Sequence, residues 1–240
     1  MKLLALDTTL GACSAAVLCT EGDRQKLYAR FEERARGHAE ALMPMVADVL
    51  AEAGVGYDEL DRIALTRGPG TFTGVRIGVA AARGLALATG AALFATDSLS
   101  VIAADARERW QQENDGGARP QQLAALVDAR RGEVYFALYD AKGACLHAPA
   151  VVTRAEALRL IGAPEGTLAA GSGVAAMREL LPDRGFLAAY DALQPDARVL
   201  ARLALTGEPC ASPPSPLYLR QPDAKPQDDA ALPRRQPHEG

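Results

Sequence analysis

The stretch LLALDTTLGACSAAVL, residues 3–18, contains two short apolar runs joined by a polar turn. The first run ends in Asp7, Thr8 and Thr9, and the second begins after a tight connection at Gly11. Apolar runs of this length on either side of such a turn are typical of a β-hairpin. The sequence therefore predicts that the fold begins with an antiparallel pair of strands.

The same plan returns in LAALVDARRGEVYFALYD, residues 123–140. At a constant offset of 121 residues, Asp7 corresponds to Asp128 and Gly11 to Gly132. Two short segments can agree by chance, but an offset of about half the 240-residue chain indicates an internal duplication. We therefore expect an α/β fold of two related lobes, each with a sheet that opens on a hairpin.

Hydrophobic periodicity and turn signals predict the other elements. We expect strands at 25–34 and 62–68, helices at 38–53, 74–89 and from Ser98 or Ser100 onward, a strand and helix over 167–181, and a last helix over 196–207. The predicted division is a first lobe at 1–103, a poorer second lobe at 104–212 and a tail at 213–240. Seven of the 15 prolines lie in this tail. Its segment PLYLR has residues able to dock, and the remainder is expected to be mobile.

Composition limits the classes of function. The net charge of −4 argues against a wide basic face that grips nucleic acid. The four cysteines form no C-x-x-C pair, so neither a zinc site nor a disulfide framework is indicated. No stretch approaches the roughly 20 apolar residues of a membrane helix, and the N-terminus does not resemble a secretory signal, so we expect a cytoplasmic protein.

A glycine-rich loop opens the segment RGPGTFTGVRIGVAAARGLA, residues 67–86. Such a loop before a helix can cradle a phosphate. However, no lysine lies beside it, Pro69 removes one backbone donor, and Phe72 is bulky. A rigid turn that allows close helix packing is therefore the favoured interpretation, with Thr71 or Thr73 as the helix cap. The structural residues of this loop are Gly68, Pro69, Gly70, Thr71, Thr73 and Gly74.

The first two predicted helices carry unusually wide apolar surfaces. The apolar arc of helix 38–53 spans roughly 160°, and Pro44 should kink that helix or mark a late start. Helix 74–89 is apolar or small nearly all round, apart from Arg76 and Arg83 on one narrow edge. Such helices must be covered by their own core, by a partner, or by both. The sequence does not decide which face of either helix points outward.

Few residues suggest chemistry. Asp7 and Thr8 have the placement that actin-like ATPases and sugar kinases use to face phosphates and metal, and with Arg76 they are weak candidates for nucleotide contact. The alternative is that Asp7 and its threonines satisfy the backbone of their own turn. The repeated turn places Arg130 and Arg131 where a phosphate loop needs small residues. The three histidines form no metal or catalytic motif, so we expect no catalytic and no metal-binding residue.

Five segments together closely resemble the TsaB (YeaZ) family of bacterial tRNA threonylcarbamoyladenosine (t6A) biosynthesis proteins. They are LALDTT, HAEALMPMVADVLAEAGV, GPGTFTGVRIGVAAARGLA, VDARRGEVYFALY and PLYLR. The resemblance implies a duplicated actin-like ATPase (ASKHA) fold with a reduced second lobe. It also implies a non-catalytic paralogue of TsaD that serves as a scaffold subunit.

In that family the sister subunit TsaD carries the metal histidines and transfers the threonylcarbamoyl group to tRNA. At the corresponding place this chain has Ser98 and Ile102, neither of which is a plausible metal ligand. The resemblance implies that this chain alone binds no cofactor, and that ATP or ADP and the metal belong to partner subunits. The expected partners are TsaD and the ATPase TsaE, with a homodimer when TsaD is absent and tRNA contact only indirect or through a small patch.

The family pairs with TsaD through the first two helices. We expect an apolar docking surface with a polar rim of Arg76 and Arg83, which alternatively contact a nucleotide near the junction. Two rival functions remain, namely a stand-alone actin-like phosphotransferase and a peptidase acting on the sister subunit; the peptidase lacks any recognisable nucleophile and base. The apolar part of the predicted docking surface is Leu42, Met43, Met45, Val46, Val49, Phe72, Ile77 and Leu85.

Overall fold

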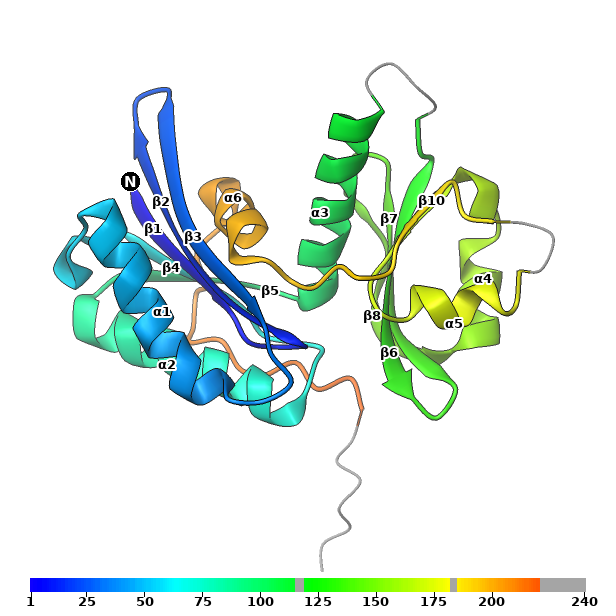
Figure 1. Ribbon diagram of the computed structural model, residues 1–240, viewed down its shortest axis with the longest axis horizontal. Coiled ribbons are helices and arrows are strands. Elements are labelled where there is room, and N and C mark those ends of the chain that lie inside the picture. Colours follow the sequence, from blue (N-terminus) through cyan, green and yellow to red (C-terminus); the bar gives the residue numbers. More distant parts are fainter. Residues whose placement is uncertain (115–118, 182–184, 221–240) are drawn as a thin grey trace, which may run out of the picture.

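The computed structural model describes residues 1–114, 119–181 and 185–220, which contain two five-stranded mixed sheets (Figure 1). The first sheet has the order β3-β2-β1-β4-β5 and the second the order β8-β7-β6-β9-β10. The strands are β1 (Lys2–Asp7), β2 (Ala12–Glu21), β3 (Arg24–Glu33), β4 (Arg62–Thr66), β5 (Ala92–Thr96), β6 (Gln122–Arg130), β7 (Glu133–Asp140), β8 (Cys145–Thr153), β9 (Thr167–Ala170) and β10 (Ala188–Tyr190).

Six α-helices and two short 3-10 helices accompany the sheets within the described residues. The α-helices of the first half are longer than those of the second half, where α5 has only 5 residues. The helices are α1 (His38–Ala53), η1 (Tyr57–Glu59), α2 (Phe72–Thr89), α3 (Ser98–Glu113), α4 (Arg154–Ile161), η2 (Pro164–Gly166), α5 (Val174–Arg178) and α6 (Ala197–Thr206).

The two sheets follow one plan, which confirms the predicted duplication. In each, three strands run antiparallel to their neighbours and two further strands add in parallel. Asp7 pairs with Ser14 across the first hairpin, and Asp128 pairs with Val134 across the second. The offset seen in the sequence therefore reflects equivalent positions in two related lobes.

The helices form layers on both faces of the sheets. α1 and α2 cover the outer face of the first sheet, and α4 and α5 pack on the outer face of the second (Figure 1). Between the sheets, α6 packs on β1, β2 and β4, whereas α3 packs on β6, β7 and β9. Each lobe thus receives its inner helix from the other half of the chain. The predicted boundary after residue 103 falls inside α3, and α6 was assigned to the wrong lobe.

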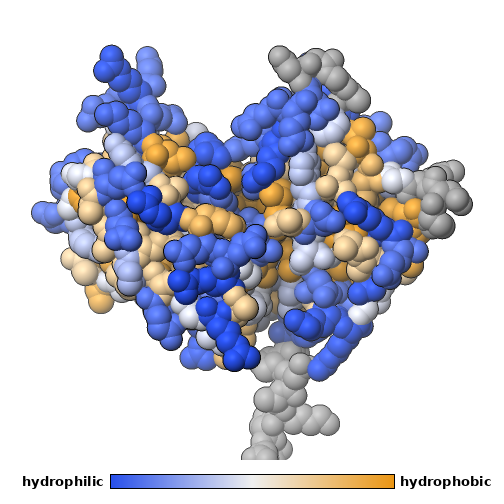
Figure 2. Space-filling model, viewed as in Figure 1, coloured by the Kyte–Doolittle hydropathy of each residue, from blue (hydrophilic) through white to orange (hydrophobic). Residues whose placement is uncertain are grey.

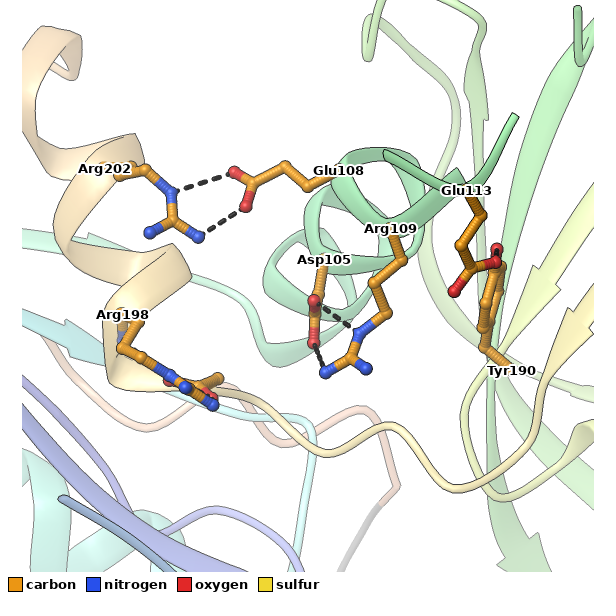
Figure 3. A network of polar contacts seen from close by, with 8 residues as sticks. Asp105, Glu108, Arg109, Glu113, Tyr190, Arg198 and Arg202 are labelled. Carbon is orange, nitrogen blue, oxygen red and sulfur yellow. Dashed lines mark hydrogen bonds and ion pairs between the residues drawn. The ribbon is translucent and has the colours of Figure 1, made fainter. Parts of the chain in front are cut away.

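Polar contacts connect α3 to α6 and to the second sheet. Arg202 of α6 forms a bidentate pair with Glu108 of α3, and Arg109 pairs with Asp105 one turn away (Figure 3). At the C-terminal end of α3, Glu113 accepts a hydrogen bond of 2.7 Å from the Tyr190 hydroxyl of β10. The contacts of α3 therefore join both lobes. A notch remains between the lobes at the top of the space-filling view, with hydrophilic side chains along its rim (Figure 2).

Of the first two helices, α1 starts at the predicted residue and α2 does not. α2 begins at Phe72, two residues early, because the Thr71 side chain caps it by accepting a hydrogen bond from the Gly74 N–H. α1 begins at His38, so Pro44 lies within the helix and does not mark a late start. Pro44 is exposed, and its missing donor therefore costs no buried hydrogen bond.

The glycine loop packs against the turn between β1 and β2. A Cβ added to Gly74 would lie 2.1 Å from the Thr8 carbonyl oxygen, and one added to Gly70 would lie 2.2 Å from that of Thr9. Thr8 Oγ1 donates to the Gly74 carbonyl at 2.7 Å. The glycines thus serve close approach, as predicted, but they approach a strand end rather than a second helix.

The segment Pro216–Arg220, which we call the strap, crosses from one lobe to the other. The Leu217 N–H donates to the Arg67 carbonyl at 2.6 Å, and the Tyr218 ring stacks on Phe72 with centroids 5.4 Å apart. Arg220 then donates to the Ala129 carbonyl at 2.8 Å and pairs with Glu133 in the second lobe. Docking of PLYLR is therefore confirmed, whereas the predicted mobility of 221–240 lies outside the described residues.

We expect Gly74→Ala to lower the free energy of unfolding by at least about 3 kcal/mol, because the new methyl group meets backbone that cannot rotate away. The matched control is Gly84→Ala on the same helix, where an added Cβ meets nothing within 4 Å. That change should raise the free energy of unfolding by about 0.5–1 kcal/mol. Urea denaturation measures both, and equal effects would contradict the proposed contact.

Removal of the strap should also destabilise the fold. A chain ending after Ala211 loses the contacts of Leu217, Tyr218 and Arg220, and we expect its free energy of unfolding to fall by roughly 2–4 kcal/mol. A chain ending after Arg220 keeps them and should match the full-length protein. Denaturation of the three lengths compares them directly, and equal midpoints would show that the strap adds no stability.

Candidate functional site

Asp7 lies at the end of β1 and is enclosed by its own chain. Its side chain is 1% exposed and accepts hydrogen bonds from the Thr9 N–H at 3.2 Å, from Thr9 Oγ1 at 2.8 Å and from Thr66 Oγ1. Burial raises the pKa of the carboxyl to about 7, although the threonine hydrogen bonds pull it the other way. Asp7 therefore satisfies its turn, which was the alternative to a phosphate-facing role.

The glycine loop uses its polar backbone groups within the protein. The Thr71 N–H donates to the Thr9 carbonyl at 2.8 Å, and the Gly74 N–H donates to Thr71 Oγ1 at 3.1 Å. Ser98 donates its N–H to the Gly68 carbonyl at 2.9 Å and its hydroxyl to the Pro69 carbonyl at 2.5 Å. The loop is thus a joint between β1, α2 and α3. These contacts support the rigid-turn interpretation over a phosphate cradle.

A cleft of about 690 Å³ lies between the lobes beside this joint. Its charged side chains come from the loop before α1, from the first turn of α1 and from the end of β6, where the second hairpin turn begins. Arg130 and Arg131 of that second turn both have positive φ, at 62° and 57°. Neither Asp7 nor Thr8 lines the cleft. The charged residues that line it are Arg34, Arg36, His38, Glu40, Asp128 and Arg130.

His38 serves the first hairpin rather than a ligand. Its Nε2 lies 3.1 Å from the Leu10 carbonyl oxygen, and the residue is half-buried at the start of α1. Within residues 1–114, 119–181 and 185–220, no group of three or more His, Cys, Asp or Glu residues could hold a metal ion. In the same part of the chain, no helix is long and apolar enough to span a membrane.

Half of the predicted apolar docking residues face the core. Their side chains pack on the first sheet and are at most 4% exposed, so they offer no surface to a partner. The prediction was wrong for these four because a wide apolar arc does not reveal which side meets the sheet. The buried residues are Leu42, Met45, Val46 and Val49.

The other four are accessible and lie with the arginines on the outer side of α1 and α2. Phe72 is 55% exposed and Met43 40%, while Ile77 and Leu85 are half-buried. Arg76 and Arg83 are exposed, and the Arg76 guanidinium lies 5.0 Å from the centre of the Phe72 ring. Ile77 also lines the cleft, whereas Met43, Phe72, Leu85 and the two arginines do not.

The sequence reasoning missed Leu87, which is 89% exposed on α2. The signal was available, since Leu87 follows Arg83 by four residues and Arg76 by eleven, which places all three on one face of a helix. We define the docking face as the exposed residues of this face and of the neighbouring face of α1. Its members are Met43, Ala47, Phe72, Arg76, Ala80, Arg83, Gly84 and Leu87.

Replacement of Asp7 by asparagine should reduce the pH dependence of stability. The folded-state pKa of Asp7 is raised, so the unfolded chain loses its proton first, and wild-type stability falls as pH rises from about 4 to about 7. Between pH 4.5 and 8, the free energy of unfolding of Asp7→Asn should rise relative to that of the wild type by on the order of 3 kcal/mol. Denaturation at both pH values measures this gain.

The exposed Asp128, at the equivalent position in the second lobe, provides the control. In Asp128→Asn, the free energy of unfolding should change between the two pH values by the same amount as in the wild-type protein. If the free energies of unfolding of the wild type and Asp7→Asn differed by the same amount at both pH values, burial would not raise the pKa of Asp7.

The comparisons with known proteins agree with this architecture. The family model described as TsaD, tRNA N6-adenosine threonylcarbamoyltransferase, matches residues 31–183. The TsaB protein of Escherichia coli is 40% identical over 140 residues, which cover 58% of this chain and 55% of that protein, so the chain matches about half the length of this relative. An uncharacterized protein of Mycobacterium tuberculosis is 33% identical over 228 residues, covering 93% of this chain and 94% of the relative.

Among solved structures, a Pseudomonas aeruginosa protein described as similar to the peptidase YeaZ superposes with a TM-score of 0.72. It is 34% identical in sequence and covers 91% of this chain and 99% of its own. A second structure, titled YeaZ from the same organism, superposes with a TM-score of 0.70. Sequence and fold agree over nearly the whole described chain, and the protein is therefore a member of the TsaB (YeaZ) family.

Proposed function

We propose that this chain is a non-catalytic scaffold subunit in t6A biosynthesis, which binds the TsaD threonylcarbamoyltransferase through the docking face and holds it in an active conformation. The observation that carries the proposal is the surface of α1 and α2, where Leu87, Phe72 and Met43 are 89%, 55% and 40% exposed. Small residues between them let another helix approach closely. Several large apolar side chains exposed on one surface are typical of an interaction site.

The interior of the first lobe supports a non-catalytic role. Asp7 and the glycine loop are the features that would serve phosphate chemistry, and both are engaged within the protein. The arginines at the second turn occupy the position where a phosphate loop needs small residues. We therefore assign ATP or ADP and the metal to the partner subunits.

The same docking face accounts for the other proposed assemblies. Because a two-fold dimer uses the same patch on both copies, two chains would pair through this face when TsaD is absent. The ATPase TsaE would then join the heterodimer rather than this chain alone. Direct contact with tRNA is limited to a small arginine patch, since the chain carries a net charge of −4.

We expect Leu87→Glu to weaken co-purification with the TsaD subunit by about tenfold or more, because it removes an apolar contact and a carboxylate must lose its water to enter a buried interface. The control is Leu146→Glu, which introduces the same charge at a leucine that is 58% exposed on β8 of the second lobe. This control should bind like the wild type. Leu87 packs on no core residue, so both variants should remain folded.

The experiment has a second readout in the t6A content of tRNA. In cells lacking the endogenous subunit, wild type and Leu146→Glu should restore the modification, whereas Leu87→Glu should not. Full binding and full modification with Leu87→Glu would overturn the assignment of the docking face. ATP turnover by the purified chain that Asp7→Asn abolishes would instead support a phosphotransferase and overturn the scaffold role.

A further inference from the structure

A second cavity, of about 320 Å³, lies between the lobes beside α3. One face of α3 lines it, through residues spaced as i, i+3, i+4 and i+7. Strands and helices of both lobes complete its wall. The lining residues are Phe94, Thr96, Ser100, Ala103, Ala104, Arg107, Leu123, Tyr139, Lys142, Gly143 and Leu203.

The body of this cavity is apolar and contains a fixed polar group. Phe94, Leu123 and Leu203 supply apolar surface from three different elements. Ser100 donates its hydroxyl proton to Asp97 at 2.5 Å, so the Tyr139 hydroxyl, 3.1 Å away, must donate to Ser100. The Tyr139 oxygen therefore keeps its acceptor sites, and burial raises the pKa of its hydroxyl, so it stays neutral.

Two cations lie at the turn between β7 and β8, which forms one edge of the cavity. The Arg107 guanidinium donates to the Lys142 carbonyl at 2.6 Å. It fits there because Gly143 has no side chain, and a Cβ at this position would lie 2.4 Å from the Arg107 Nη1. The carboxylate of Asp140 accepts the backbone N–H groups of Lys142 and Ala144 within the turn. In the described parts of the chain, neither Arg107 nor Lys142 forms an ion pair.

We propose that this cavity binds a small organic carboxylate with an apolar body. Ligand sites typically combine a mostly apolar wall with a few convergent polar groups, and they occur preferentially between domains. The apolar wall suits a ring or branched chain, and the planar guanidinium of Arg107 suits a carboxylate at the edge. Because β5 and α6 pack in the first lobe and β6 and β7 in the second, such a ligand contacts both lobes at once.

The proposal is independent of the scaffold role, since neither α1 nor α2 contributes to the cavity. Its test is titration of the full-length protein with phenylacetate, followed by backbone amide NMR. We expect saturable shifts at Ser100, Lys142 and Gly143. Phenylacetamide, which lacks the charge, and acetate, which lacks the ring, should each bind about tenfold more weakly or not at all.

Two variants and one control locate the site. Arg107→Gln and Lys142→Gln should each weaken phenylacetate binding by about fivefold or more, whereas Lys26→Gln, which removes a charge from the exposed strand β3, should leave it unchanged. The proposal is overturned if phenylacetate causes no saturable shift at these amides in the wild-type protein. It is equally overturned if the amide or acetate binds as well as phenylacetate, or if both variants bind like the wild type.

Discussion

The contact between Thr8 and Gly74 is the constraint on which the rest of the first lobe depends. It brings the backbone of α2 so close to the end of β1 that no side chain fits between them, and the Thr8 hydroxyl bonds the Gly74 carbonyl. Whereas the Thr71 cap sets the start of α2, this contact fixes the rotation of the helix about its own axis. The same rotation buries Val75 and Val79 against the sheet and turns Arg76, Arg83 and Leu87 outward.

The connection between the lobes follows from an exchange of helices rather than from a hinge segment. α3 comes directly after the first sheet but packs on the second, and α6 comes after the second sheet but packs on the first. The first turn of α6 is held by Ser14, whose hydroxyl accepts the Ala197 N–H at 3.0 Å, and its last turn by Arg62, which donates to the Gly207 carbonyl. Together with the strap, this exchange makes each lobe depend on chain from the other half.

The sequence predicted local features well, because they are encoded by neighbouring residues. The hairpin pattern, its repeat and a threonine cap for α2, at Thr71 or Thr73, all follow from local sequence. The outward faces of α1 and α2 could not be predicted, because helical periodicity defines an apolar stripe but not the neighbour that covers it. The lobe assignment of α6 was missed for a related reason, since its partners on β1 and β2 lie more than half the chain away.

The two equivalent turns at Asp7 and Asp128 show how the duplicated lobes have diverged. The first turn encloses the Asp7 carboxyl, and this burial raises its pKa. Two threonine hydroxyls and one backbone N–H donate hydrogen bonds to the carboxyl in place of water. The second turn leaves Asp128 exposed and places two arginines in the left-handed region. The first turn is therefore closed within its own lobe, whereas the second turn carries its carboxylate and its arginine side chains at the surface.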